Sequence, residues 1–472
     1  MRSTMSSQTI FSGQDQARTG RFHVRTMFTT GMGVFSDGYS LSSIAIVLPL
    51  VLASFGRQSL TGIQSSLLTG SALAGMALGG LVFGVLGNRG RKRYYGIDVM
   101  VMAATALAQA FVPDVGWLIA VRFLFGIGAG ADYVLSPTIL GEHANTRDRG
   151  KLMVVGFGVS WVSGAALAGI VDLLCHAGGL SNGDTWRVVL AFGALPALTV
   201  IYLRRRLPET ARYLARVRGD TAATAAVLAE VEADHYVDDD LAGIRLVDRK
   251  SMRYYFARNA RAIVTACVLW FLFDIIGYSS GLYGPSLIAK GLGLSPEVFT
   301  LVTYGAFSIP ALLLAASIVD RSGRRQMTAR WSVAAAVALV VFGAYKDAVG
   351  IMAPGVALVL LGLFTITGGV ANAVPTSGMN GVELAPTRAR TVVQGLTVAS
   401  GRAGATVAAF VFPALFAHLG ESVAIYFLAA VTAMAAVVAW FALPEAAGRS
   451  LEESSDEDID SGILAASMDA AA

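Results

Sequence analysis

The sequence predicts an all-α membrane protein in which twelve transmembrane helices form two pseudo-symmetric halves of six helices each. Three observations lead to this prediction: the composition, the spacing of the apolar segments and the recurrence of motifs. Of the 472 residues, 55% are hydrophobic and 14% are charged, and the mean hydropathy is +0.61. Soluble domains carry about 25% charged residues, so the composition excludes an ordinary soluble protein. The 52 glycines suit close contacts between membrane helices.

Twelve apolar segments are long enough to cross a bilayer, which takes about 20 helical residues and more when the helix is tilted. We expect the first six at 27–53, 62–86, 94–113, 116–140, 152–176 and 187–203. We expect the other six at 261–287, 297–319, 327–345, 351–381, 393–417 and 422–443.

The polar segments divide the chain into five regions. We expect a cytoplasmic N-terminal segment at 1–26, a six-helix bundle at 27–203, a cytoplasmic linker with amphipathic helices at 204–260, a second bundle at 261–443 and an acidic cytoplasmic tail at 444–472.

Basic residues concentrate in every second loop, and such loops face the cytoplasm. They follow the second, fourth, sixth and eighth segments and include Arg89, Arg91, Lys92, Arg93, Arg147, Arg149, Lys151, Arg204, Arg205, Arg206, Arg321, Arg324 and Arg325. Both termini are therefore expected in the cytoplasm. We find no organelle-targeting segment and expect a plasma-membrane location.

Four features recur about 240 residues apart, which is half the chain and indicates two repeats with the substrate between them. Glu142-x4-Arg147-x-Arg149 recurs as Glu383-x4-Arg388-x-Arg390, and Leu207-Pro208-Glu209 recurs as Leu443-Pro444-Glu445. A basic loop after Asn88 recurs after Asp320. Asp37 in the first segment has its counterpart in Asp274 of the seventh.

The most unusual apolar segment is the seventh, because Asp274 is the only charged residue between Ile263 and Leu287. A carboxylate in a membrane costs about 2.5–3.5 kcal/mol on insertion scales and usually has a function. Trp270 and Tyr278 lie four residues before and after Asp274, hence on one helix face. We interpret this face as part of a substrate or proton site. The alternative is a buried carboxylate that is satisfied by its neighbours.

Three of the further charges inside predicted helices are candidates for a functional role. Arg402 is the only charge between Thr391 and Ala417 and is a candidate for anion binding. It could instead pair with Asp274 to join two helices, and the two roles are compatible. Asp37 and Asp132 are candidates for a proton relay, with a purely structural role as the alternative.

The loop Asp320-Arg321-Ser322-Gly323-Arg324-Arg325 matches the D-R-x-G-R-R motif of the major facilitator superfamily. The chain resembles that superfamily over nearly its whole length, which implies its fold and a cytoplasmic gate of acid–base contacts. The counterpart loop departs from the motif, because Asn88 replaces the acid. The gating residues that the resemblance implies are Asn88, Arg89, Arg91, Glu142, Arg149, Asp320, Arg321, Arg324, Glu383 and Arg390.

Three stretches resemble proton-coupled phosphate symporters: Gly130–Ser136, Pro208–Tyr213 and Trp270-x3-Asp274-x3-Tyr278. The terminal motif that begins at Pro444 is shared with sugar porters, but the glutamine pair of sugar porters is absent from the seventh segment. The substrate-binding residues that the resemblance implies are Tyr133, Trp270, Asp274, Tyr278, Asn372 and Arg402. The proton-coupling residues that it implies are Asp37, Asp132 and Asp274.

Two positions depart from the phosphate pattern: Ser40 stands in place of an acid, and Val155 in place of a glutamine. We therefore expect proton-coupled symport of inorganic phosphate or a similar small anion by alternating access. The alternatives are a carrier of organic acids or sugars and a transporter-like substrate sensor.

The expected partners are a small anion, protons and the lipid bilayer, without nucleic acid, and the expected working unit is a monomer. Cys175 and Cys267 lie in or beside apolar segments, which argues against a disulfide framework. We find no nucleotide loop, metal-ligand cluster or nucleophile–base pair in the sequence, so we expect neither enzyme activity nor a cofactor.

Overall fold

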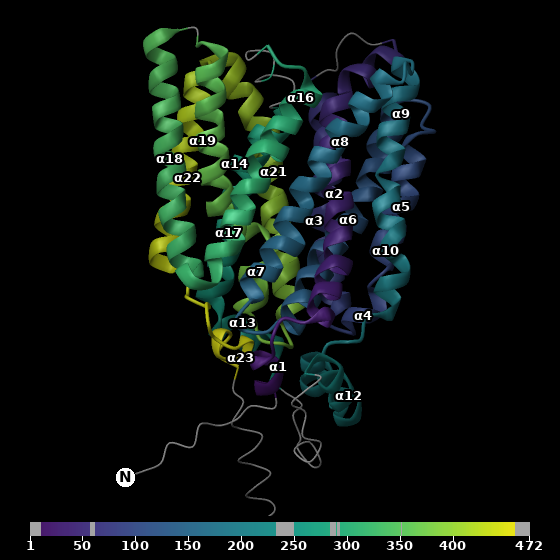
Figure 1. Cartoon of the computed structure of the whole chain (residues 1–472), viewed down its shortest axis with the longest axis vertical. Coiled ribbons are helices and arrows are strands. Elements are labelled where there is room, and N and C mark those ends of the chain that lie inside the picture. The colour runs from purple at the N-terminus through teal and green to yellow at the C-terminus, as the bar shows by residue number, and fades with distance from the viewer. Residues whose placement is uncertain are drawn as a thin grey trace, which may run out of the picture.

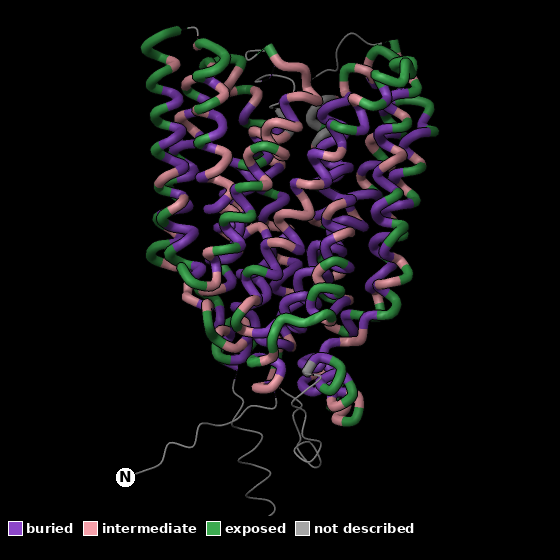
Figure 2. The backbone as a smooth tube through the Cα atoms, viewed as in Figure 1, coloured by how far each residue is buried: buried purple, intermediate pink, exposed green. Residues whose placement is uncertain are grey.

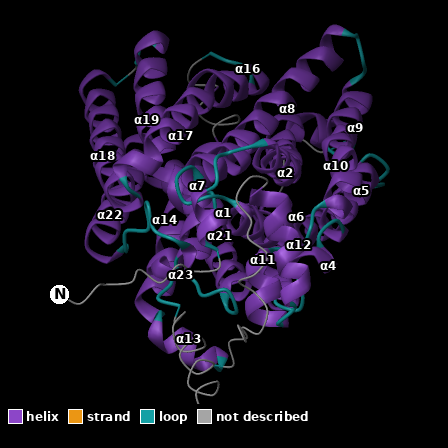
Figure 3. Cartoon of the chain, turned by 60° about the horizontal axis from the view of Figure 1, so that its bottom comes forward, coloured by secondary structure: helices purple, strands orange, loops and turns teal. Residues whose placement is uncertain are grey.

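Long helices dominate the structure, and no β-strand occurs among the residues that it describes (Figure 3). The computed structural model describes residues 11–56, 62–232, 250–283, 289, 293–350 and 352–457. The long helices run side by side along the longest axis of the molecule (Figure 1).

The first half of the chain forms the helices at the right of Figure 1. They are α2 (Arg21–Ser54), α3 (Gly62–Gly87), α4 (Arg91–Tyr94), α5 (Ile97–Gln109), α6 (Val115–His143), α7 (Arg149–Met153), the π-helical segment η1 (Val154–Val159), α8 (Ser160–Ala177), α9 (Asn182–Phe192) and α10 (Ala194–Arg206).

The second half of the chain repeats this arrangement. Its helices are α14 (Ala260–Tyr283), α16 (Pro296–Thr300), the π-helical segment η5 (Leu301–Ser308), α17 (Ile309–Ser322), α18 (Arg324–Val349), α19 (Pro354–Thr376), α20 (Met379–Glu383), α21 (Arg390–Leu419) and α22 (Glu421–Ala442).

Short helices gather at one end of the bundle, the lower end in Figure 1, which we call the base. They are α1 (Ser12–Gln16), α11 (Ala211–Tyr213), the π-helical segment η2 (Leu214–Arg218), α12 (Thr221–Glu232), α13 (Met252–Arg258) and α23 (Leu451–Ser454).

Eleven described helical segments are long and apolar enough to cross a membrane. The twelfth predicted segment, 94–113, corresponds to α5, which is shorter because Gly96 interrupts the helix with φ +112°. The Asp98 carboxylate accepts hydrogen bonds from the backbone N–H groups of Gly96 at 2.7 Å and Val99 at 2.9 Å, which starts α5 at Ile97. The prediction of a twelve-helix membrane fold is confirmed.

The exposed residues lie on the outside of the bundle, whereas the buried residues concentrate inside it (Figure 2). Many of the exposed residues are large and apolar. Phe441, Val359 and Trp117 are 69%, 68% and 61% exposed. Helices satisfy their own backbone hydrogen bonds, so such a surface is stable in lipid. The chain is therefore a multi-pass membrane protein.

Glycines let helices from opposite halves approach closely. A Cβ atom at Gly84 of α3 would lie 3.0 Å from the carbonyl oxygen of Thr391 in α21, and one at Gly395 of α21 would strike the backbone of Gly80. Small residues at such positions bring two helix backbones into contact. The same two halves also meet where α7, η1 and α8 pack against α16, η5 and α17.

Arg204, which we expected at the start of the linker, lies inside α10 and is fully buried. Its guanidinium group binds Asp98 at 2.6 Å and Asp132 at 2.7 Å. The sixth membrane helix consequently extends beyond its predicted end at residue 203, because these two carboxylates compensate the arginine charge.

Candidate functional site

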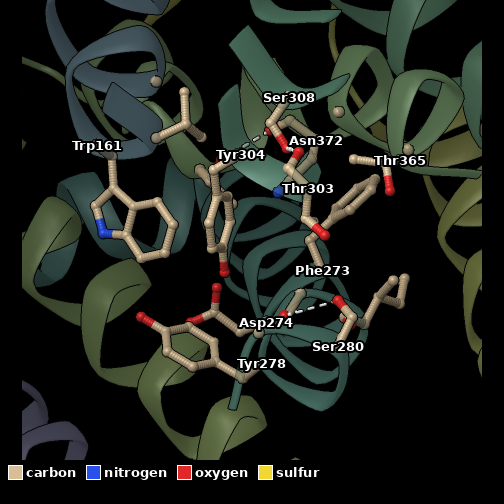
Figure 4. Close-up of a pocket in the computed structure, with 18 of the residues that line it drawn as sticks. Trp161, Phe273, Asp274, Tyr278, Ser280, Thr303, Tyr304, Ser308, Thr365 and Asn372 are labelled. Atoms are coloured by element: carbon tan, nitrogen blue, oxygen red, sulfur yellow. Dashed lines mark hydrogen bonds between the residues drawn. The ribbon is translucent and has the colours of Figure 1, made fainter. Parts of the chain in front are cut away.

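A cavity of about 200 Å³ lies between the two halves of the bundle. The first half contributes Leu41 and Ser42 of α2, Tyr133 of α6, Phe157 of η1 and Trp161 of α8. The second half contributes, among others, Asp274 and Tyr278 of α14, Thr303 and Tyr304 of η5, Asn372 of α19 and Arg402 of α21. Figure 4 shows how several of them, including Trp161, Asp274 and Tyr304, lie around the space.

Arg402 and Asp274 form the charged centre of the cavity. Their Nη2 and Oδ2 atoms are 3.2 Å apart, and both residues are buried. The glycines next to Arg402 explain this proximity: a Cβ atom at Gly401 would lie 2.9 Å from the Asp274 carboxylate, and one at Gly404 would strike the carbonyl group of Phe271. These glycines therefore hold α21 against α14, so that the charges meet.

Aromatic rings enclose the arginine. The Arg402 guanidinium carbon lies 4.9 Å from the ring centre of Tyr133 and 5.1 Å from that of Tyr278. Arg402 also donates a hydrogen bond to the Tyr278 hydroxyl group. Trp270 packs behind this layer, with its ring centre 6.3 Å from that of Tyr133, and does not line the cavity. Cation–π contacts such as these favour a fixed, desolvated cation.

Four buried side-chain atoms of cavity residues lack hydrogen-bond partners among the described residues. They are Nε of Arg402, Oδ1 of Asn372, Oγ1 of Thr303 and Oδ2 of Asp274, the last of which faces Arg402 in the ion pair. Buried polar atoms are normally paired, so these atoms are suited to a ligand. Of the six predicted substrate-binding residues, the structure brings all except Trp270 to the wall of the cavity.

Asp37 lies one layer behind the cavity and is fully buried. The indole N–H of Trp161 donates a hydrogen bond to its Oδ2 atom at 3.2 Å, and the Tyr133 side chain interacts with the same carboxylate. Its Oδ1 atom has no partner among the described residues. Tyr133 and Trp161 thus connect Asp37 to the cavity wall.

Asp132 belongs to a different cluster. Its carboxylate binds Arg204 at 2.7 Å and accepts a hydrogen bond from Ser136 at 2.5 Å. Asp132 does not line the cavity, and the structure does not place it beside Asp274.

Sequence reasoning missed Trp161, Tyr304 and Thr303 as cavity residues. Each is a polar or aromatic residue in an otherwise apolar segment, and Tyr304 and Thr303 lie in π-helical η5. The two departures from the phosphate pattern lie elsewhere. Val155 packs in an apolar cluster, and Ser40 faces Gly193, so neither lines the cavity.

Two glutamates join the two halves at the base. Glu142 binds Arg91 of its own half at 3.0 Å and Arg390 of the other half at 2.8 Å. Glu383 repeats the pattern, with Arg324 of its own half at 2.9 Å and Arg149 of the other at 2.8 Å. The recurring Glu-x4-Arg-x-Arg motif therefore builds two equivalent bridges between the halves.

Asp320 adds a third contact between the halves, because it accepts hydrogen bonds from the backbone N–H groups of Gly150 at 2.9 Å and Lys151 at 2.8 Å. The structure brings Asn88, Arg89 and Arg321 to the base but not into these bridges. Arg89 and Arg321 are exposed, and Oδ1 of Asn88 has no partner among the described residues.

The repeated Leu-Pro-Glu motif also has a structural role that the sequence did not reveal. Glu209 accepts a hydrogen bond from the backbone N–H of Lys92 in α4 at 3.1 Å. Glu445 accepts equivalent bonds from Arg324 and Arg325 at the start of α18, at 2.8 and 3.2 Å. A carboxylate at a helix N-terminus satisfies free N–H groups and complements the helix dipole.

Arg212 joins both ends of the chain at the base, binding Asp15 and Glu452 at 2.8 Å each. Burial alone would raise the pKa of Glu452, but the Arg212 guanidinium lowers this pKa to about 2. Burial keeps the pKa of Asp15 above its ordinary value despite Arg212. Glu452 is therefore the carboxylate that Arg212 holds ionised.

Comparisons with known proteins agree with this geometry. Residues 25–457 match the family model described as Sugar (and other) transporter. Low affinity inorganic phosphate transporter 4 of Lotus japonicus is 30% identical over 95% of this chain and 94% of its own length. Probable inorganic phosphate transporter 1-6 of Arabidopsis thaliana is 29% identical over 95% of this chain and 96% of its own length.

Among solved structures, the major facilitator superfamily proton:xylose symporter XylE bound to 6-bromo-6-deoxy-D-glucose superposes with a TM-score of 0.77. The sequences are 22% identical, and the match covers 92% of this chain and 98% of that one. This likeness concerns the fold. The relatives are transporters and not enzymes.

Proposed function

The chain belongs to the Sugar (and other) transporter family, and from this premise we propose that it carries inorganic phosphate or a similar small anion together with protons. It is a membrane transporter and not an enzyme. One observation carries the proposal: a buried arginine, Arg402, borders a cavity between the halves and has a carboxylate, Asp274, within 3.2 Å.

The Arg402–Asp274 pair explains how an anion and a proton become coupled. Without substrate, Asp274 neutralises the arginine. An anion that binds the guanidinium group takes the place of this carboxylate and leaves two negative charges close together. Like charges in a desolvated site favour protonation of one of them. A proton on Asp274 removes the repulsion, so anion and proton are bound together and released together.

Phosphate is the substrate that the relatives favour, because those quoted above are named inorganic phosphate transporters. Val155 and Ser40 weaken this assignment less than the sequence suggested, since neither residue lines the cavity. Arg402, Tyr133, Tyr278 and Asn372 supply hydrogen-bonding groups around the space. The arginine fork matches the geometry of phosphate oxygens.

An organic acid is the second candidate, and the apolar wall of the cavity favours it. Phe157, Phe273, Phe299 and Phe364 also line the space. A carboxylate with an apolar body would place its charge on Arg402 and its body against these rings.

Alternating access requires a gate at each end, and the glutamate bridges at the base are suited to one of them. Glu142 and Glu383 each join the two halves, so the base opens only when both bridges break. We assign the base to the cytoplasm because the basic loops lie there, which places both termini in the cytoplasm of a plasma-membrane protein. The working unit we propose is a monomer in the lipid bilayer, without nucleic acid.

Uptake by proteoliposomes under an imposed pH gradient tests the proposal. Radioactive phosphate should accumulate when the outside is acidic, and unlabelled phosphate should compete with it. Asp274→Asn should abolish gradient-driven accumulation, and Arg402→Met should abolish uptake. Competition by carboxylates and sugars ranks the alternatives. Failure of phosphate to accumulate or to compete refutes phosphate as the substrate, and normal gradient-driven uptake by Asp274→Asn removes Asp274 from coupling.

A further inference from the structure

Trp161 touches both a buried carboxylate and the opposite half of the bundle. Its indole N–H donates to Asp37 at 3.2 Å. Its ring meets that of Tyr304 edge to face, with the ring centres 5.6 Å apart at 74°. Asp37 and Trp161 belong to the first half and Tyr304 to the second, and Figure 4 shows the two rings at the cavity.

The backbone next to Asp37 explains why Trp161 is held in place. A Cβ atom at Gly38 would strike the carbonyl group of Trp161, and one at Gly164 would strike the carbonyl group of Phe35. Helices α2 and α8 therefore touch through their backbones on both sides of this hydrogen bond. Such close packing sets the spacing of the two helices where the Trp161 indole meets Asp37.

The helices that carry the aromatic pair are π-helical nearby. The hydroxyl of Ser160, which directly follows η1, donates to the carbonyl oxygen of Val155 at 3.3 Å, and the hydroxyl of Ser308 in η5 donates to the carbonyl oxygen of Thr303 at 2.9 Å. Both bonds link residues five apart. Insertions of this kind mark functional positions in helices and interrupt the regular hydrogen-bond ladder. The contact between the halves thus lies where both helices depart from regular α-helix.

Several charged or titratable neighbours act on the Asp37 carboxylate. They lie on three helices packed against it and are Arg122, Asp132 and Tyr133 of α6, Tyr278 of α14 and Arg402 of α21. Arg402 is also the predicted anion ligand. Substrate binding and protonation of Asp37 therefore act on the same set of charges.

We propose that Trp161 is a positioning residue that transmits the protonation of Asp37 to the contact between the halves; this inference rests on the proton-coupled transport proposed above. An ionised Asp37 accepts a charge-assisted bond and holds the indole against Tyr304. A proton on Asp37 converts this bond to a weaker neutral one. The indole then turns more freely, the ring contact with Tyr304 loosens, and the halves separate more easily at the cavity.

The test compares Trp161→Phe with wild type. Phenylalanine keeps a ring for Tyr304 but lacks the N–H for Asp37. Uptake under the gradient, divided by each variant's own exchange of phosphate without a gradient, should fall by about fivefold to tenfold, as expected for the loss of one charge-assisted bond. Asp37→Asn should cause the same loss, and the double variant should add nothing.

Trp186→Phe is the matched control. The Trp186 indole also donates a hydrogen bond, but to the neutral Ser54 hydroxyl at 2.9 Å, so gradient stimulation should be unchanged. A second readout is the tryptophan emission of the purified protein during a pH titration. Wild type should show a pH-dependent component that disappears in Trp161→Phe and in Asp37→Asn.

If the pH gradient stimulates uptake by Trp161→Phe as strongly as uptake by wild type, the inference is wrong. If Trp161→Phe does not fold, the emission titration of Asp37→Asn decides: the same pH-dependent tryptophan emission as in wild type also overturns the inference. If wild type itself does not respond to a pH gradient, the proposed function fails, and the emission titration still decides whether Trp161 senses Asp37.

Discussion

Replacing Arg402 by methionine should destabilise the protein because it leaves Asp274 buried without its countercharge. Arg402 binds the Asp274 carboxylate at 3.2 Å and contacts the rings of Tyr133 and Tyr278. Removal of one partner from a buried ion pair costs about 3–5 kcal/mol. Loss of the two cation–π contacts adds about 1–2 kcal/mol. Methionine keeps the length and the apolar character of the side chain, so a new cavity contributes little.

The same geometry predicts strong coupling between the two charges. Asp274→Asn should cost less, about 1–3 kcal/mol, because Arg402 keeps both aromatic rings and the Tyr278 hydroxyl. In the double variant no unpaired charge remains. Its destabilisation should therefore be smaller than the sum of the two single values by about 2–3 kcal/mol.

Thermal unfolding of the purified protein in detergent measures these differences. The order of Tm should be wild type, Asp274→Asn, double variant and Arg402→Met, from highest to lowest. Added phosphate should raise the Tm of wild type but not that of the two variants without Arg402. Arg402→Lys, which keeps the charge for Asp274, should have a higher Tm than Arg402→Met. Additive effects of the two substitutions, with a coupling below about 0.5 kcal/mol, would show that the ion pair does not hold α14 and α21 together.

Three further predictions concern the charges around the base. Glu383→Gln breaks a buried bridge between the halves, at a cost of about 3–5 kcal/mol, and should let the base open more often. A cysteine introduced at buried Leu152 should therefore react faster with a maleimide. Arg204→Met leaves two buried carboxylates unpaired and should lower Tm, with partial recovery when Asp98→Asn is added. Glu452→Gln should lower stability by about 3 kcal/mol at pH 7. Because the pKa of Glu452 is lowered from 4.5 to about 2, the difference from wild type should persist above pH 4.5 and vanish as the pH falls toward 2.

One control for these predictions changes charge without breaking a buried bridge. Lys346→Ala removes a partly exposed ion pair with Glu421 and should alter the free energy of unfolding by less than about 1 kcal/mol. The maleimide assay needs a background without Cys175 and Cys267. An unchanged labelling rate in Glu383→Gln contradicts the gate. A Glu452→Gln difference that grows at acid pH contradicts the assigned ionisation of this residue.

The sequence by itself determined the membrane fold and marked two charged residues that border the cavity. Twelve apolar segments fold as helices because lipid offers no hydrogen-bond partners to the backbone N–H and C=O groups, which must therefore pair with each other. Isolated charges such as Asp274 and Arg402 are costly there, so their positions already marked the charged centre. The recurring motifs showed that the chain consists of two equivalent halves.

Only the tertiary structure decided which charges meet. Arg204 looked like a loop residue, but Asp98 and Asp132 compensate its charge and draw it into the bundle. Trp161 and Tyr304 carry no charge that would mark them, and they become neighbours only because α8 and η5 pack across the two halves. Spacing along one helix predicts which residues share a face. Partners more than a hundred residues apart depend on close packing, which the glycines beside Asp37 and Arg402 make possible.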